Sequence, residues 1–304
     1  MQLGYQKSPS LPAFQSIGLL LIWLMCVPTS RAAQIPATNR LAILVSGLSG
    51  NHEFKIYFQN AMGELRQTLL RKGYQREELV LFSEEHAPDS LWQQSRLATR
   101  KNLREFFGKL KGRSQPYSEV FIFIVGHANG HDEEAILHLP GEDMSYAELM
   151  NAIDPIPAQQ MTVVVAAPQG EAWIQKLSRP QRVVIAGNGY RQYDFIPLLF
   201  LRTFPLTLEK AGILKKDSEA DVDSPRSLFD VFLETQQKVL AWYKRNNLQV
   251  TEMALLDADG DKKGDSFIKE GAPVLKEIAL AHSSDARAAA LILFSDQGGS
   301  YGKH

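Results

Sequence analysis

Two apolar stretches decide the fold: Val120-Phe-Ile-Phe-Ile-Val-Gly-His127 and, further along the chain, Met161-Thr-Val-Val-Val-Ala-Ala-Pro-Gln-Gly170. Each run is short, rich in β-branched residues and ended by small residues, which is typical of a strand buried in a parallel sheet. In an open α/β sheet, the loops that leave the carboxyl ends of such strands form the ligand crevice. The first stretch brings His127 to that crevice, whereas the second brings Ala167, which carries no reactive group.

Similar apolar runs recur along the chain and alternate with segments of helical periodicity. Strands are predicted at 41–46, 78–82, 119–125, 161–166, 181–186 and 288–294, and helices at 54–72, 96–110, 146–153, 171–177, 195–204 and 225–245. This alternation indicates a three-layer α/β/α sandwich with a mostly parallel sheet of about six strands. No second core is visible, so we expect one domain over 41–296 and a disordered tail at 297–304.

The amino-terminal segment has the pattern of a secretory signal peptide. Lys7 is the only charge before the apolar run Ile17–Val27, and Ser30-Arg-Ala32 offers small residues for cleavage near Ala32 or Ala33. The run is shorter than the roughly 20 residues that a transmembrane helix needs. We therefore expect a signal peptide over 1–33, a linker over 34–40, and export to the periplasm or exterior of a bacterium. The alternative is a retained anchor, which would be the protein's only membrane contact.

Composition limits the chemistry that the chain can perform. Cys26 is the single cysteine and lies inside the predicted signal peptide, so the remaining chain has no disulfide, thiolate metal site or cysteine nucleophile. The formal net charge of −1 gives no reason to expect nucleic acid as a partner.

The order and spacing of five segments are informative, although none of them is specific alone. They are Ala42–Gly50, Phe121–His127, Leu139–Asp143, Val183–Gly187 and Ala254–Asp261. Together they resemble the C13, or legumain-type, branch of the caspase-like peptidases, and more closely its exported bacterial relatives. The resemblance covers residues 41 to about 265 and implies a caspase-like fold.

The resemblance also implies roles for individual positions. In that family the general base is a histidine after the third core strand, and His127 occupies the matching place. The next residue is usually a glycine, and here it is Ala128. The family's cysteine nucleophile follows the fourth core strand, where this chain has Ala167. Since alanine has no nucleophilic atom, the resemblance implies the fold and argues against the family's activity.

The leading hypothesis is therefore an exported pseudo-peptidase that binds a peptide or protein partner in its crevice. The residues expected to line that crevice are Ser46, Ser49, Ala128, Asn129, Gln169, Gly170 and Asn188. The alternative is a hydrolase in which His127 works with another nucleophile or a bound metal. The segment 47–51 does not have the Gly-x-Ser-x-Gly pattern of a nucleophile elbow, so we interpret it as a glycine-rich turn. A third hypothesis is a purely structural envelope protein with a collapsed crevice.

One acidic segment resembles the start of a calcium-binding loop. Asp257, Asp259 and Asp261 place carboxylates at alternate positions, as oxygen ligands of Ca²⁺ commonly are. An EF-hand would need glycine at the sixth position and glutamate at the twelfth, where this chain has Lys262 and Ile268. No cofactor is required by the sequence, and a solvated acidic turn competes with Ca²⁺ binding as the interpretation.

Overall fold

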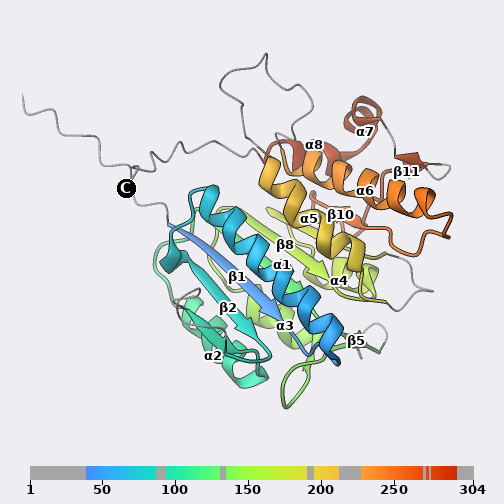
Figure 1. Ribbon diagram of the computed structural model, residues 1–304. Coiled ribbons are helices and arrows are strands. Elements are labelled where there is room, and N and C mark those ends of the chain that lie inside the picture. Colours follow the sequence, from blue (N-terminus) through green and yellow to red (C-terminus); the bar gives the residue numbers. More distant parts are fainter. Residues whose placement is uncertain are drawn as a thin grey trace, which may run out of the picture. The chain divides into compact units, whose positions relative to one another are not determined.

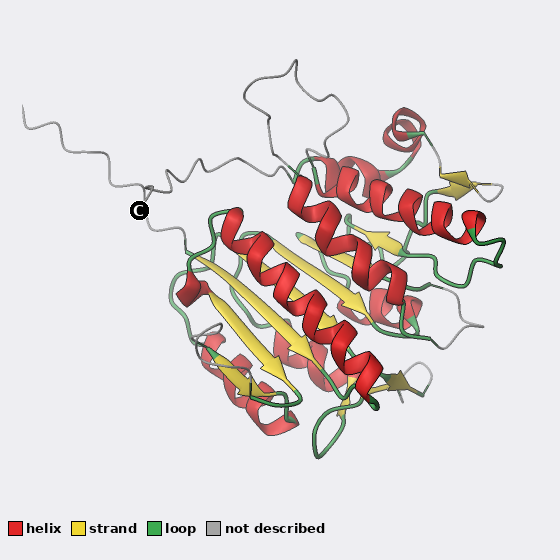
Figure 2. Cartoon of the chain, viewed as in Figure 1, coloured by secondary structure: helices red, strands yellow, loops and turns green. Residues whose placement is uncertain are grey.

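The computed structural model describes residues 39–86, 94–130, 135–189, 195–211, 227–269, 272–273 and 275–292. Over these residues the chain forms a seven-stranded sheet with helices on both faces (Figure 1, Figure 2). The predicted α/β/α sandwich with a mostly parallel sheet is confirmed, with one strand more than the six expected. The predicted signal peptide, most of the linker and the tail lie outside the described residues.

The strand order of the central sheet is β10-β9-β8-β4-β1-β2-β3. The strands are β1 (Arg40–Ser46), β2 (Leu79–Ser83), β3 (Ser95–Leu97), β4 (Glu119–Val125), β8 (Met161–Ala166), β9 (Arg182–Ala186) and β10 (Leu255–Asp257). All neighbours pair in parallel except β10, which is antiparallel to β9. The central strands end in register, because Val125 pairs with both Ser46 and Ala166. The loops after β1, β4 and β8 therefore leave one edge of the sheet together.

Two apolar clusters cover the two faces of the sheet. The helices on one face are α1 (His52–Arg71), α5 (Leu198–Lys210), α6 (Leu228–Arg245) and α8 (Ser284–Ala290). Those on the other are α2 (Arg100–Leu110), α3 (Tyr146–Ile153) and α4 (Gly170–Leu177). Successive strand side chains point to opposite faces, so Phe123 packs in the first cluster and Ile122 in the second. Burial on both faces explains why these strands are apolar throughout.

Short local signals fix the ends of the helices. Asn51 caps α1 by accepting a hydrogen bond from the Phe54 N–H, and Ser145 caps α3 by accepting one from the Glu148 N–H. Gly73, which follows the C-cap residue Lys72, ends α1 with a left-handed φ of +82°.

Two predicted elements near the sheet edges are wrong. The run predicted as a strand at 288–294 begins inside α8, whose cap is Ser283 and whose alanines are the best helix formers. The helix predicted at 96–110 begins only at Arg100, after a Thr99 cap, because residues 95–97 pair with β2 as β3.

Two further boundaries differ from expectation. The helix predicted at 195–204 is α5, which starts after Pro197 and runs to Lys210. The acidic segment around Asp257, where no strand is predicted, begins with β10, which pairs with β9.

Smaller elements complete the described chain. They are the 3₁₀ turn η1 (Arg76–Glu78), the short sheet β5 (Ala128–Asn129), β6 (Ile136–Leu137) and β7 (Met144–Ser145), the pair β11 (Ile268–Lys269) and β12 (Ala272–Pro273), and α7 (Lys276–His282). No helix in the described part of the chain is both long enough and apolar enough to cross a membrane.

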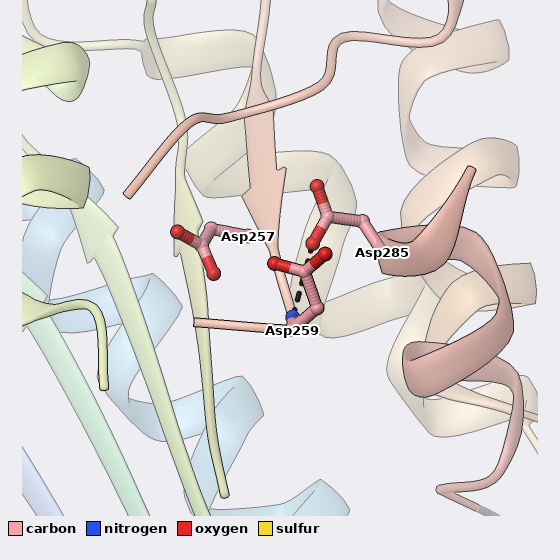
Figure 3. A group of neighbouring side chains, drawn as sticks. All are labelled: Asp257, Asp259 and Asp285. Carbon is pink, nitrogen blue, oxygen red and sulfur yellow. Dashed lines mark hydrogen bonds between the residues drawn. The ribbon is translucent and has the colours of Figure 1, made fainter. Parts of the chain in front are cut away.

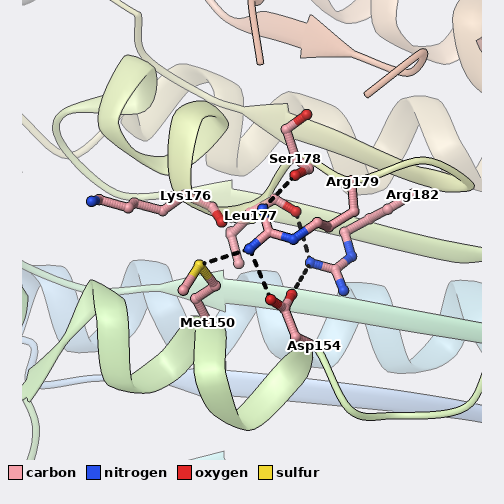
Figure 4. A network of polar contacts seen from close by, with 7 residues as sticks. All are labelled: Met150, Asp154, Lys176, Leu177, Ser178, Arg179 and Arg182. Carbon is pink, nitrogen blue, oxygen red and sulfur yellow. Dashed lines mark hydrogen bonds and ion pairs between the residues drawn. The ribbon is translucent and has the colours of Figure 1, made fainter. Parts of the chain in front are cut away.

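A polar network joins α3 and α4 to the start of β9 (Figure 4). Arg182 is 5% exposed and donates to Asp154 Oδ1 at 2.7 Å and to the Leu177 carbonyl at 2.7 Å. Arg179 donates to the other carboxylate oxygen of Asp154 at 2.8 Å. Burial lowers the pKa of Arg182, and the ion pair with Asp154 opposes that shift. The network lies at the amino end of β9, away from the edge where His127 lies.

Candidate functional site

The carboxyl ends of four parallel strands form the edge where the sequence places the crevice. Backbone hydrogen bonds continue one residue past the strands, from Gly47 N to Val125 O at 2.8 Å and from Gly187 N to Val165 O at 2.7 Å. The loops after β1, β4, β8 and β9 are therefore neighbours at this edge. This arrangement brings the predicted segments around Ser49, His127 and Gln169 to the same side of the sheet.

His127 is held by backbone and by aromatic rings. Its Nε2 donates to the Ser49 carbonyl oxygen at 2.9 Å, because a carbonyl can only accept. The ring also meets Phe54 edge-on, with 5.0 Å between centroids, and lies 6.4 Å from the Phe58 ring. Within the described chain, no hydroxyl or carboxylate side chain bonds to His127. The imidazole is thus fixed in one tautomer without the acidic or nucleophilic partner that catalysis uses.

Ser49 turns its hydroxyl away from His127. Ser49 Oγ donates to Glu84 Oε2 at 2.6 Å, and the Ser49 backbone N–H reaches the same oxygen at 3.2 Å. The residue is 4% exposed, and Ser46 is 7% exposed. Neither serine hydroxyl is hydrogen-bonded to the imidazole, so the geometry supports the predicted glycine-rich turn over a serine nucleophile.

The loop after β8 is rigidly held. Ala167 is fully buried, and the Pro168 carbonyl accepts a hydrogen bond from Trp173 Nε1 at 3.1 Å. Gly170 N donates to Asn188 O at 2.8 Å. A Cβ atom at Gly170 would lie 2.1 Å from that same oxygen, so only glycine allows this approach. Asn188, from the loop after β9, is itself fully buried.

Gln169 is the unusual residue of this loop. Its φ of +62° is left-handed, a conformation that costs energy for a residue with a Cβ and that often occurs at functional sites. Both polar atoms of its side-chain amide are buried, and neither has a hydrogen-bond partner. A buried amide without partners is costly, so this loop holds an amide oxygen and an NH₂ group that are covered and are not satisfied within the described protein.

The positions expected to be base and nucleophile lie in different surroundings. The His127 ring packs on Phe54 and Phe58 of α1, and Phe58 belongs to the cluster on that face. Ala167 belongs to the opposite cluster, together with Trp173 of α4. No described contact joins the two positions.

Ala128 and Asn129 extend the chain from His127 into a small sheet. Ala128 pairs with Leu137 and is buried, whereas Asn129 is exposed. A second histidine lies here: His138, whose Nδ1 is 3.0 Å from Asp143 Oδ2. Asp143 also accepts the Leu139 N–H through its other oxygen, so the pair stabilises the turn between β6 and β7.

The acidic segment forms a different group from the predicted one (Figure 3). Asp257, Asp259 and Asp285 each offer a carboxylate oxygen within 4.8 Å of the others. Asp261 is not in this group: it is exposed, and its Oδ1 accepts the Lys263 N–H. Asp285 was missed because it lies 26 residues beyond Asp259 in the sequence, in α8, where no element was predicted before residue 288.

Backbone N–H groups hold the carboxylates in place. Asp257 accepts from Gly260 N at 2.9 Å and from Lys262 N at 2.8 Å, and Lys262 takes a left-handed φ of +70°. Asp285 Oδ1 accepts from Ala258 N at 2.7 Å and from Asp259 N at 3.0 Å.

Burial dominates the electrostatics of this group. It raises the pKa of Asp285 to about 7, against the opposing effect of the two N–H groups. Burial also raises the pKa of Asp257, and the neighbouring Ser178 hydroxyl opposes that rise. Burial thus disfavours the charged form of both carboxyls, and no cationic side chain of the described chain pairs with either of them.

Comparisons with known proteins leave the family open. No protein-family profile matches the chain, and no curated protein matches it. Similar solved structures include the Drosophila initiator caspase Dronc, with 10% identity and a TM-score of 0.45 over 76% of this chain and 83% of Dronc. Caspase-1 from Spodoptera frugiperda is also 10% identical, with a TM-score of 0.47 over 73% of this chain and 89% of its own. At scores this low the likeness assigns neither a family nor an activity, and neither protein is of the legumain type, so the C13 resemblance remains a prediction.

Proposed function

We propose that the chain is an exported, non-catalytic member of the peptidase-like proteins that it resembles, and that it binds an extended peptide segment of a partner at the carboxyl edge of its sheet. The proposal rests on the C13 resemblance for the position of the nucleophile. Ala167 stands at that position, and the chain after residue 26 contains no cysteine that could replace it.

The observation that carries the proposal is the amide of Gln169, which is covered and unsatisfied. The residue as a whole is partly exposed, and the proposal is that its side chain turns outward to bind the peptide. A primary amide offers one acceptor and two donors, which is the complement of a peptide bond. Its loop is fixed by Trp173 and by the Gly170–Asn188 contact, so binding need not order it. Preorganised polar groups of this kind give affinity at low entropic cost.

The hydrolase alternative has less support. His127 donates its Nε2 proton to a backbone carbonyl, and the nearby Ser49 hydroxyl is bonded to Glu84. A general base needs hydrogen-bond reach to the proton that it removes. In the described chain, the Ser49 hydroxyl is oriented toward a carboxylate that could take its proton, but the serine is buried.

The test combines hydrolysis and binding on residues 33–304. A mixed fluorogenic peptide library measures turnover, and an array of unstructured peptides measures binding, for wild type, His127→Ala and Gln169→Ala. Gln181→Ala is the matched control, because Gln181 is also a glutamine with a left-handed φ, of +66°, but it is exposed and precedes β9 at the opposite edge.

We expect no turnover, and binding that is about tenfold weaker in Gln169→Ala, the loss expected for about 1.4 kcal/mol of hydrogen bonding. Gln181→Ala should bind as wild type does. Turnover that disappears in His127→Ala would overturn the non-catalytic proposal. Equal binding by both glutamine variants would move the binding site away from this loop.

Export is part of the same proposal and rests on Lys7 and the apolar run Ile17–Val27. Expression of residues 1–304 in a bacterium, followed by amino-terminal sequencing of the exported fraction, should give a chain that begins after Ala32 or Ala33. Full-length protein in the membrane fraction would instead indicate an anchor.

A further inference from the structure

We propose that Asp257, Asp259 and Asp285 form a binding site for one calcium ion, which joins the loop after β10 to helix α8. The site is independent of the proposed peptide-binding edge. Its ligands differ from those that the sequence suggests, because the third carboxylate comes from Asp285 and not from Asp261.

The spacing of the three carboxylates suits an ion of this size. One oxygen from each side chain lies within 4.8 Å of the other two. Oxygens that share a Ca²⁺ at about 2.3–2.6 Å are separated by at most about 5 Å. Figure 3 shows the carboxylates of Asp259 and Asp285 side by side, with that of Asp257 across from them. Water would complete the coordination, as it does in many calcium sites.

The charge of the group calls for a cation. Asp257 is fully buried and Asp285 is 5% exposed, and the ion pairs of the described chain include none of the three carboxylates. Asp154 shows how this protein treats a carboxylate elsewhere, by pairing it with Arg179 and Arg182. Buried carboxylates are normally paired with a cationic side chain or a metal. At this site the described residues supply oxygens and backbone N–H groups.

A second observation comes from Ser178, at the end of α4. Its side chain is fully buried beside Asp257, close enough to lower the pKa of that carboxyl, yet its Oγ makes no hydrogen bond of normal geometry within the described chain. The hydroxyl points away from the arginine network (Figure 4). A buried hydroxyl is costly to leave unsatisfied. A water molecule on a bound ion, or a carboxylate drawn into place by that ion, would give this hydroxyl its partner.

The ligand set favours calcium over magnesium. Ca²⁺ accepts an irregular set of carboxylate and water oxygens, whereas Mg²⁺ demands near-octahedral geometry and gives up its water reluctantly. Asp257 ends β10, Asp259 lies in the loop that follows, and Asp285 comes from α8, which packs in the apolar cluster with α6. Binding should therefore stabilise the attachment of α8 to the edge of the sheet.

The test uses residues 33–304 with CaCl₂ as the probe. Isothermal titration calorimetry gives stoichiometry and affinity, and thermal unfolding in EDTA or in CaCl₂ gives the effect on stability. Asp259→Asn and Asp285→Asn remove one charge each while keeping an oxygen that can accept the present N–H bonds. Asp261→Asn is the matched control, since it removes a charge from the same loop outside the group. MgCl₂, and NaCl at equal ionic strength, distinguish calcium from other ions and from screening.

We expect one Ca²⁺ per chain with a dissociation constant on the order of 10⁻⁴ M, as in extracellular modules. Calcium at 10 mM should raise the melting temperature of wild type and Asp261→Asn by several degrees. Asp259→Asn should bind at least about tenfold more weakly, and Asp285→Asn should show no rise. No heat and no shift for wild type at 10 mM would overturn the proposal. An equal shift in Asp285→Asn would also overturn it, because the ion would then bind elsewhere.

Discussion

At the scale of single residues, Asp154 compensates the buried charge of Arg182. Arg182 is 5% exposed, and among the described residues Asp154 is the only carboxylate that pairs with it. Removing one partner of a buried ion pair leaves the other charge uncompensated. Asp154→Ala should therefore lower the free energy of unfolding by about 3 kcal/mol, near the lower end of the range for buried pairs, because Asp154 is itself partly exposed. Urea denaturation followed by circular dichroism measures this loss.

The control is the exposed helical pair of Lys101 and Glu105, whose side chains are 82% and 56% exposed. Glu105→Ala should change the free energy of unfolding by less than about 0.5 kcal/mol, since exposed pairs contribute little. If Asp154→Ala lowered the free energy of unfolding as little as Glu105→Ala does, Arg182 would have found another partner or reached water in the absence of Asp154.

At the scale of elements, the sequence predicts the long strands and helices whose pattern is local. It misses short elements that form only by pairing with a segment far away in the sequence. Five buried strands can be recognised from their own residues, because both of their faces are apolar. They are β1, β2, β4, β8 and β9. β10 has three residues and becomes a strand only by pairing with β9. Helix α8 contains Ala288-Ala-Ala290, which favours a helix, but the apolar run that follows suggested a strand. Asp285 lies in the same helix, 26 residues beyond Asp259, and its place in the acidic group depends on this long-range packing.

The start of α5 shows another long-range dependence. Pro197 precedes the helix and cannot cap it, so Glu252, from a distant loop, accepts the Leu199 and Phe200 N–H groups at 3.2 and 2.9 Å. Burial raises the pKa of Glu252, although those N–H groups oppose the rise. A carboxyl with a raised folded-state pKa contributes stability that is present below its unfolded pKa and is lost as pH rises through the folded value.

The difference in unfolding free energy between wild type and Glu252→Gln should therefore fall as pH rises from about 4.5, the region of the unfolded pKa, toward 7. Subtracting the variant removes the contribution of other buried carboxyls, such as Glu119. Denaturation at four or five pH values measures the trend. A difference that grows with pH would show that the N–H groups at the start of α5 outweigh burial.

At the scale of the whole molecule, topology could be predicted and side-chain orientation could not. The alternation of strands and helices predicts an α/β sandwich and brings the loops after β1, β4 and β8 to one edge. It does not reveal that the His127 ring packs on α1 while Ala167 joins the cluster on the opposite face. Nor does it reveal the unsatisfied amide of Gln169, because that depends on how four loops pack together.

The absence of cysteine after residue 26 allows the openness of this edge to be measured. Ala167→Cys in residues 33–304 gives a chain with a single thiol, placed where Ala167 is fully buried. The thiol should react with a disulfide reagent far more slowly in the folded protein than in the unfolded chain. Its reaction rate should rise with urea concentration in parallel with the loss of the circular dichroism signal. The two changes coincide because the burial of this position depends on the whole sheet. Ala281→Cys, on an exposed position of α7, should react at once. Rapid reaction of the thiol at position 167 without urea would show that the edge opens locally and that a ligand can reach this position in the folded protein.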